Sequence, residues 1–288
     1  MKDKNTPLNR RSFLKAALGT SVAAALFPSF LGRSKQIFQS DTLKLWSCGG
    51  LSEAFTQITN RYEHMHPGIS IDYTGAFAGA LGKRILSGAV TEVFGGRGLA
   101  LTKQIKQAGL AHYFKPLCFT SFVMVTPLGN PANITKVEDM AKPGVRVILP
   151  TEASPPGSDS MKAILKNANI IEPTYKNMVG HDSCVIRMMP SIINGEGDVS
   201  IVETRLTTLP QFKGKVEVIP IEEAYFPPGP LTFCISVLKH AKDLNLANDF
   251  VDYVLSPESQ GIFEACGFIP AISPKGKQMI EKLGVKDE

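Results

Sequence analysis

Apolar positions along the chain alternate between short runs and helical spacing. Short apolar runs bounded by turn residues predict strands, and apolar residues three or four apart over longer stretches predict helices. The predicted strands are 43–47, 69–73, 91–94, 120–126, 145–149, 199–202, 215–219 and 232–237. The predicted helices are 51–65, 77–87, 98–107, 135–141, 158–167, 184–194, 244–254, 257–265 and 275–283. Strands separated by helices favour βαβ units, so the sequence predicts an α/β fold with mostly parallel sheets.

Two stretches have the character of crossings between two halves of such a fold. One is 118–127, which reads CFTSFVMVTP, and the other is 219–238, which holds four prolines. A self-contained α/β segment lies between them. We therefore predict two lobes, each a mostly parallel sheet flanked by helices, joined by two hinge strands. Lobe 1 comprises 41–122 and 232–288, and lobe 2 comprises 123–231.

The first 40 residues have the character of an export signal. They hold seven basic residues and one acidic residue, a net charge of +6, and NRRSFLK (9–15) precedes an uncharged apolar run. A basic region followed by a modest apolar run is typical of a secretory signal, and Arg10-Arg11 before Ser-Phe-Leu-Lys resembles the twin-arginine type. A membrane anchor is the alternative, although Gly19 and Pro28 make the apolar run a weak and short span. We predict a signal peptide over 1–40 and delivery to the periplasm.

Charge and cysteine usage narrow the function of the remaining chain. It carries 24 basic and 25 acidic residues, so no basic excess indicates nucleic-acid binding. The five cysteines are odd in number and widely spaced, which indicates buried small side chains rather than a disulfide framework. Nucleophile-elbow, P-loop and C-x-x-C motifs do not occur, so neither catalysis nor a cofactor is predicted.

The stretch WSCGGLSEAF (46–55) passes from a predicted strand to a predicted helix through small residues. Ser47, Cys48, Gly49 and Gly50 would place main-chain N–H groups at a helix N-terminus, where an anion is stabilised. An ordinary tight turn is the alternative. Cys48 is either a ligand for a soft metal or an inert thiol.

Two further places have the composition of a ligand site. Ala76 and Phe77 precede a predicted helix, where small residues let the main chain approach a ligand and Phe77 would add an apolar wall. A capping turn with a core Phe is the alternative. Arg97 follows a predicted strand, and its guanidinium suits an oxyanion or carboxylate, or would neutralise Glu203. A solvated loop arginine is the alternative there.

Four segments resemble the periplasmic substrate-binding proteins of ABC importers, and within them the molybdate-binding type. They are LSEAFTQITNRYEHMHPGISIDYTGAFAGALGKRILSGAVTEVF, LPTEASPPGSDSMKAIL, VIRMMPSIINGEGDVSIVETRL and SPESQGIFEACGF. The resemblance runs over about 43–272 and implies two α/β lobes joined by two strands. It also implies a monomer that passes a small ligand to a membrane permease.

The resemblance further implies where ligand donors should lie. Molybdate binders use serine hydroxyls, main-chain N–H groups and one tyrosine hydroxyl. The matching positions hold other residues in this chain, except for one valine that is retained; they are Gly50, Ala76, Phe77, Pro156, Val185 and Glu203. Ser154, in the segment that carries Pro156, is a further candidate. The ligand shell is therefore altered from that of the molybdate binders. The carboxylate of Glu203 would also repel a dianion in a partly dry cleft.

We therefore predict an extracytoplasmic solute-binding protein for an inorganic or small organic anion. The alternative is a metal or metal-chelate binding protein, since Glu203, Cys48, Cys184, His181 and the Met188-Met189 pair are residue types that bind metals. The HMH run at 64–66 is expected to be a solvated helix end. An exported enzyme or redox accessory protein is a more distant alternative.

The leader gives the first testable prediction. Replacing Arg10 and Arg11 together with Lys should hold the precursor in the cytoplasm, because twin-arginine export requires the guanidinium pair. Cell fractionation and immunoblotting measure the outcome, with Arg33→Lys as the control. Normal periplasmic delivery of the double variant would refute a twin-arginine signal.

Overall fold

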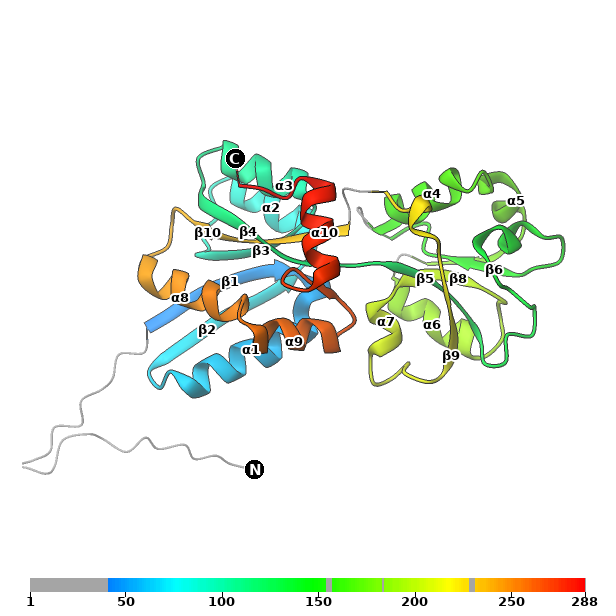
Figure 1. Ribbon diagram of the computed structural model, residues 1–288, viewed down its shortest axis with the longest axis horizontal. Coiled ribbons are helices and arrows are strands. Elements are labelled where there is room, and N and C mark those ends of the chain that lie inside the picture. Colours follow the sequence, from blue (N-terminus) through cyan, green and yellow to red (C-terminus); the bar gives the residue numbers. More distant parts are fainter. Residues whose placement is uncertain (1–40, 154–156, 183, 228–230, 288) are drawn as a thin grey trace, which may run out of the picture. The chain divides into compact units, whose positions relative to one another are not determined.

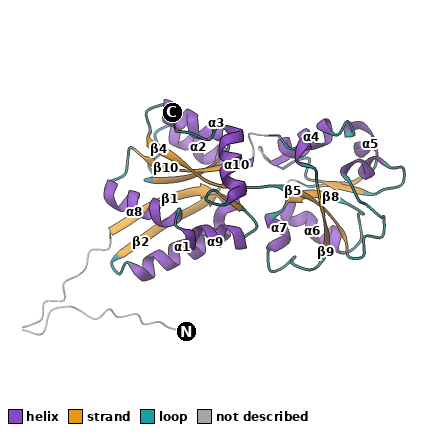
Figure 2. Ribbon diagram, in the orientation of Figure 1, coloured by secondary structure: helices purple, strands orange, loops and turns teal. Residues whose placement is uncertain are grey.

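The computed structural model describes residues 41–153, 157–182, 184–227 and 231–287 (Figure 1). The predicted signal peptide lies outside these residues, as do the candidate positions Ser154 and Pro156. Helices flank the strands throughout the described part of the chain (Figure 2). Within those residues, we find no helix with the length and apolar character needed to cross a membrane.

The first sheet has six strands in the order β11-β4-β10-β3-β1-β2. They are β1 (Asp41–Cys48), β2 (Ile69–Ala76), β3 (Val93–Arg97), β4 (Ala111–Phe119), β10 (Thr232–Leu238) and β11 (Ile269–Pro270). The helices of the same chain segments are α1 (Ser52–Met65), α2 (Ala78–Leu86), α3 (Leu99–Gln107), α8 (Leu244–Val254), α9 (Pro257–Ala265) and α10 (Pro274–Leu283). A short 3-10 turn, η1 (Gly49–Leu51), joins β1 to α1. The main core here packs Leu45 of β1 with Phe55 of α1 and Phe263 of α9.

The segment between the crossings forms a second group of elements. β5 (Phe122–Pro127) is the middle strand between β8 (Ser200–Glu203) and β9 (Val216–Pro220), and β6 (Val147–Leu149) pairs with β7 (Met178–His181). The helices are α4 (Gly157–Asn167), α5 (Ile171–Lys176), α6 (Val185–Ile193) and α7 (Arg205–Thr208), with 3-10 turns η2 (Val137–Ala141) and η3 (Glu223–Tyr225).

Strand β5 separates two apolar cores. Met124 packs in a cluster with Met161 of α4, whereas Val123 and Val125 pack in another cluster with Met188 of α6. Successive side chains of a strand point to opposite faces, so one strand supplies both cores. This explains why β5 is an uninterrupted apolar run in the sequence.

The prediction of mostly parallel sheets needs correction. β1 is parallel to β2 and β3, and β6 is parallel to β7. However, β10 runs antiparallel to β3 and β4, and β5 runs antiparallel to β8 and β9. β4 leads into the first crossing and β10 returns from the second, so the two must run in opposite directions. The six-stranded sheet is therefore mixed, the β8-β5-β9 sheet is antiparallel, and the β6-β7 pair is parallel.

Strand β4 was not predicted, because Lys115 and Pro116 interrupt its apolar pattern. In the structure the β4–β10 pairing shifts register between Phe233 and Cys234, opposite Cys118 and Pro116. Proline cannot donate to a ladder and is tolerated at such irregularities. The short elements α5, β7, α7 and β11 were also missed, because they are too short to show a period.

The crossing from β4 to β5 is short. Only Thr120 and Ser121 separate the two strands, and both residues form hydrogen bonds with other parts of the chain. The Thr120 N–H donates to the Leu231 carbonyl at 2.9 Å, and the Ser121 hydroxyl lies 2.7 Å from the Thr204 hydroxyl. The crossing is thus tied to the start of β10 and to the end of β8.

We propose that the two groups of elements are separate lobes with the boundaries predicted from the sequence. A fragment spanning 121–231 should then unfold cooperatively on its own, because it contains both cores that flank β5. A fragment spanning 128–231 is the matched control and should not fold, since it lacks the middle strand of its sheet. Urea unfolding followed by circular dichroism distinguishes the two. A non-cooperative transition for 121–231 would show that the cores depend on the rest of the chain.

Candidate functional site

Strands β1, β2 and β3 end at the same edge of the first sheet, where they place Cys48, Ala76 and Arg97. Carboxyl ends of parallel strands form the usual ligand edge of an α/β sheet. Glu203 ends β8 of the second sheet and contacts Arg97. The residues of both sheets line a cavity of about 430 Å³. Its lining residues are Cys48, Gly49, Gly50, Glu53, Ala76, Phe77, Ala78, Arg97, Ala153, Gly157, Cys184, Val185, Ile186, Glu203 and Arg205.

Most candidate site residues from the sequence line this one cavity. They are Cys48, Gly49, Gly50, Ala76, Phe77, Arg97, Val185 and Glu203. Ser47 does not: its side chain is fully buried, its hydroxyl donates to the Cys48 carbonyl at 3.0 Å, and it lies 2.8 Å from the Tyr73 hydroxyl. Tyr73 in turn donates to Ser52. Ser47 therefore supports the turn rather than facing the cavity.

A buried ion cluster forms part of the cavity lining. Arg97 Nη1 lies 2.7 Å from Glu203 Oε1, and Arg205 Nε lies 2.9 Å from Glu203 Oε2. The three side chains are only 7%, 8% and 15% exposed for Arg97, Glu203 and Arg205. The predicted neutralisation of Glu203 by Arg97 is therefore confirmed. Two guanidinium groups share one carboxylate, which leaves the cluster with a charge of +1.

Arg205 was missed by the sequence analysis. It lies two residues beyond Glu203 at the start of α7, a helix too short to be predicted. The signal available in the sequence was a cationic residue only two positions after the unexpected carboxylate of Glu203. Arg205 also faces Glu53 of α1, with 3.9 Å between Nη1 and Oε1, but the Glu53 side chain is 37% exposed. Solvent screening makes this last pair weak.

The charges of the cluster control the ionisation of Glu203. Burial alone would raise the pKa of this carboxyl, because a charged group is less stable away from water. The charges of Arg97 and Arg205, and the hydrogen bonds that they donate, outweigh burial and lower the pKa to about 2. Glu203 is consequently ionised at neutral pH.

The absence of a side chain at Gly50 leaves room for the side chain of Arg205. A Cβ atom at Gly50 would lie 3.4 Å from Arg205 Nε and 3.5 Å from Arg205 Nη2. These are ordinary van der Waals distances, so a methyl group would fit, whereas a longer side chain would meet the guanidinium. The missing side chain at Gly50 therefore positions Arg205 against the turn that ends β1.

The thiol of Cys48 is poorly suited to act as a metal ligand. It is 7% exposed, and burial raises its pKa, although the Arg97 charge and the Gly50 N–H act in the opposite direction. A raised pKa keeps the thiol protonated, whereas metals bind the thiolate. All five cysteines are free thiols.

The other metal-binding residue types do not converge. His181 pairs with Glu152 at 3.0 Å, and the ring of His66 stacks on Tyr62 at the end of α1. In the described part of the chain, no three or more His, Cys, Asp or Glu side chains are grouped so that they could hold a metal ion.

Other residues that line the cavity are apolar. Phe77 precedes α2 and is 68% exposed, and Ile186 in the first turn of α6 is 39% exposed. Ala76, Ala78, Ala153 and Val185 are further apolar residues of the cavity, and we call the whole set the apolar lining. The lining residues include no serine, threonine or tyrosine within the described chain.

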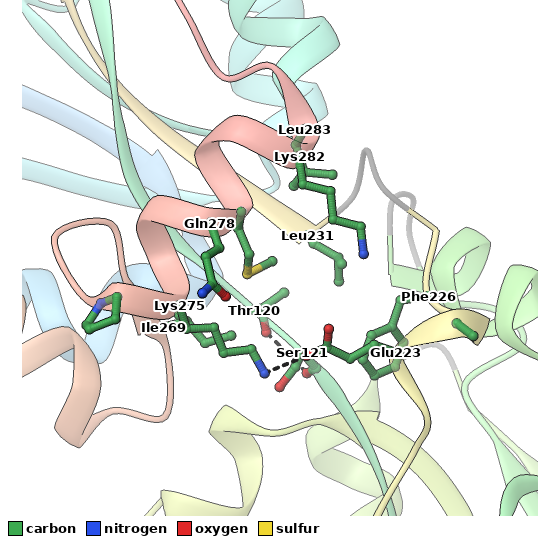
Figure 3. Close-up of a pocket in the computed structure, with 13 residues that line it drawn as sticks. Thr120, Ser121, Glu223, Phe226, Leu231, Ile269, Lys275, Gln278, Lys282 and Leu283 are labelled. Carbon is green, nitrogen blue, oxygen red and sulfur yellow. Dashed lines mark hydrogen bonds and ion pairs between the residues drawn. The ribbon is translucent and has the colours of Figure 1, made fainter.

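A larger cavity of about 700 Å³ lies beside the crossing and holds none of the predicted site residues (Figure 3). It is bordered by α10, η3 and the crossing residues Thr120 and Ser121. Its ion pair joins Lys275 and Glu223 at 2.7 Å, as the dashed line in Figure 3 shows, but these side chains are 54% and 61% exposed. The attraction within a solvated ion pair is weak. We therefore assign the ligand site to the cavity that contains the buried cluster.

The low pKa of Glu203 predicts a pH dependence of stability. Its ordinary pKa is 4.5, so the charge cluster contributes stability above about pH 4.5 that is lost as pH falls toward 2. Glu203→Gln should flatten the stability curve between pH 5 and pH 2, with a difference of at most about 3 kcal/mol. Thermal unfolding across this range measures it, and Glu172→Gln on the exposed face of α5 is the control. Parallel curves for wild type and Glu203→Gln would contradict the role of the cluster.

Comparison with known proteins shows the family to which the chain belongs. The bacterial extracellular solute-binding protein family matches residues 43–269. The molybdate-binding protein ModA of Mycobacterium tuberculosis is 25% identical over 238 residues, which cover 79% of this chain and 84% of that protein.

Solved structures show the same fold. The substrate-binding domain of a putative molybdenum ABC transporter from Clostridium difficile has a TM-score of 0.69 at 21% identity, covering 80% of this chain and 99% of that one. Iron-bound HitA from Pseudomonas aeruginosa has a TM-score of 0.61 at 17% identity, covering 78% and 84% of the two chains. The matched residues span both sheets and the cavity. The chain belongs to the bacterial extracellular solute-binding proteins, which are the substrate-binding proteins of ABC importers, and within them it resembles the molybdate-binding type.

Proposed function

We propose that the chain captures a small anion in the cavity between β1–β3 and β8 and releases it to the permease of an ABC importer. Members of the family are substrate-binding proteins of transporters rather than enzymes. The observation that carries the anion proposal is the buried Arg97–Glu203–Arg205 cluster with its charge of +1. Burial strengthens its attraction for an anion because little water screens it.

The helix ends around the cavity support the same charge preference. η1 begins at Gly49, α2 at Ala78 and α6 at Val185, and all three residues line the cavity. Free N–H groups and the helix dipole at an N-terminus favour a negative ligand. The similarity to molybdate-binding ModA agrees with an anion.

Ligand capture would act through closure of the two proposed lobes. Arg97 comes from the first sheet, whereas Glu203 comes from β8 of the second sheet and Arg205 from α7, which follows it. An anion that contacts both sets of residues stabilises the closed state, since a ligand shifts a population by its difference in affinity. Opening at the permease would then release the anion.

The alternative is a metal or metal-chelate binding protein, which the similarity in fold to iron-bound HitA keeps open. Glu203 is the only buried carboxylate among the described residues that line the cavity, and both of its oxygens accept hydrogen bonds from arginine. This donor set suits an anion better than a bare cation.

We further propose that the chain works in the periplasm as a monomer and reaches it by the twin-arginine route. The family is described as extracellular. The basic leader with Arg10-Arg11 supports the twin-arginine assignment, although it lies outside the described residues.

Opposite effects of two variants test the anion proposal. Glu203→Gln removes the negative charge and should raise anion affinity, whereas Arg205→Gln removes a positive charge and should lower it by at least about tenfold. A cation ligand would give the reverse order. Calorimetric titration with molybdate, sulfate, acetate and phenylacetate measures the affinities.

Arg61→Gln is the matched control, because Arg61 is an exposed arginine of α1 that pairs with Glu258 outside the cavity. It should bind like the wild type. If none of the four anions binds, or if Arg205→Gln binds them all as the wild type does, the proposed function is wrong.

A further inference from the structure

We propose that the ligand is a small monocarboxylic acid with an apolar body, rather than a tetrahedral oxyanion. Its carboxylate would pair with Arg205 and its carbon body would lie against Phe77 and Ile186. This inference rests on the proposed function and names the substrate class of the same cavity.

The first argument is size. A tetrahedral oxyanion has five heavy atoms and occupies roughly the volume of three water molecules, about 90 Å³ at ~30 Å³ each. The cavity holds about 430 Å³. An oxyanion would leave most of this space unfilled, whereas organic ligands bind in pockets of roughly 300–1,000 Å³.

The second argument is the donor set. Among the described residues that line the cavity, the side-chain N–H donors belong to Arg97 and Arg205. Arg205 has the most exposed side chain of the cluster at 15%, compared with 7% for Arg97. A planar guanidinium matches a planar carboxylate with two parallel hydrogen bonds.

The third argument is charge. The buried cluster carries +1, but Glu53 also lines the cavity and faces Arg205, so the four charged lining side chains sum to zero. A monoanion therefore adds less unbalanced charge than a dianion, which would also be repelled by the carboxylates of Glu203 and Glu53 in a partly dry cavity.

The fourth argument is the apolar lining. Phe77 leaves 68% of its surface exposed and Ile186 leaves 39%, although both line the cavity. They come from helices of the two different groups of elements, α2 and α6. Large apolar side chains exposed in the same cavity gain free energy when an apolar group covers them.

A matched ligand series tests the proposal by calorimetric titration of the purified protein. Phenylacetate and 4-methylpentanoate should bind more tightly than acetate, molybdate or sulfate. Phe77→Ala should weaken phenylacetate binding about 10- to 100-fold and leave acetate binding within about twofold, because only the apolar contact is lost. Because the Phe77 side chain is largely exposed rather than part of a core, this variant keeps the fold.

Leu128→Ala is the matched control, since Leu128 is 59% exposed but does not line the cavity. It should bind phenylacetate like the wild type. Tighter binding of molybdate or sulfate, sensitive to Arg205→Gln but not to Phe77→Ala, would overturn this inference and leave the proposed function standing. Binding of no anion of either kind would overturn both.

Discussion

The buried contact of Glu203 with Arg97 and Arg205 is the interaction on which the site depends. An isolated ionised carboxylate is very costly to bury, and so is an isolated guanidinium. Each of the three groups is therefore buried only because the others are present. Since Arg97 ends β3 and Glu203 ends β8, the same contact also fixes the edges of the two sheets relative to each other at the cavity.

Several features around the cluster exist to support it. Gly50 leaves space for the guanidinium of Arg205, and the turn that carries Gly50 is held from below by the hydrogen bonds among Ser47, Tyr73 and Ser52. These hydroxyl groups act on the ligand only through the backbone that they position. A site of this kind is more rigid than one built from a free loop.

Much of the fold followed from the sequence because its long elements have strong periods. β1, α1, α8 and α9 lie where the apolar spacing predicts them, and Ser256 caps α9 through the Ser259 N–H. Strand direction did not follow, because periodicity carries no information about which neighbour a strand pairs with. The antiparallel course of β10 is set by its return from the crossing, which is a property of topology.

The candidate site followed in part for a related reason. Turns after strands marked Cys48, Ala76 and Arg97, because carboxyl ends of parallel strands meet at one edge. Whether Ser47 or Cys48 faces the cavity depends on the pleat and on partners such as Tyr73, which lie far away in the sequence. The role of Arg205 likewise depends on the space beside Gly50, which no local pattern reveals.

The two-residue crossing at Thr120 and Ser121 has a thermodynamic consequence. Because β4 continues almost directly into β5, and Ser121 is bonded to Thr204, the direct connection between the two groups of elements is short, and the contact of Arg97 with Glu203 is intramolecular. The entropic cost of closing a chain grows with its length, so a short connection keeps the cost of reforming this contact after each opening small. A longer connection would raise that cost for every capture event, and the same contacts would give a larger dissociation constant.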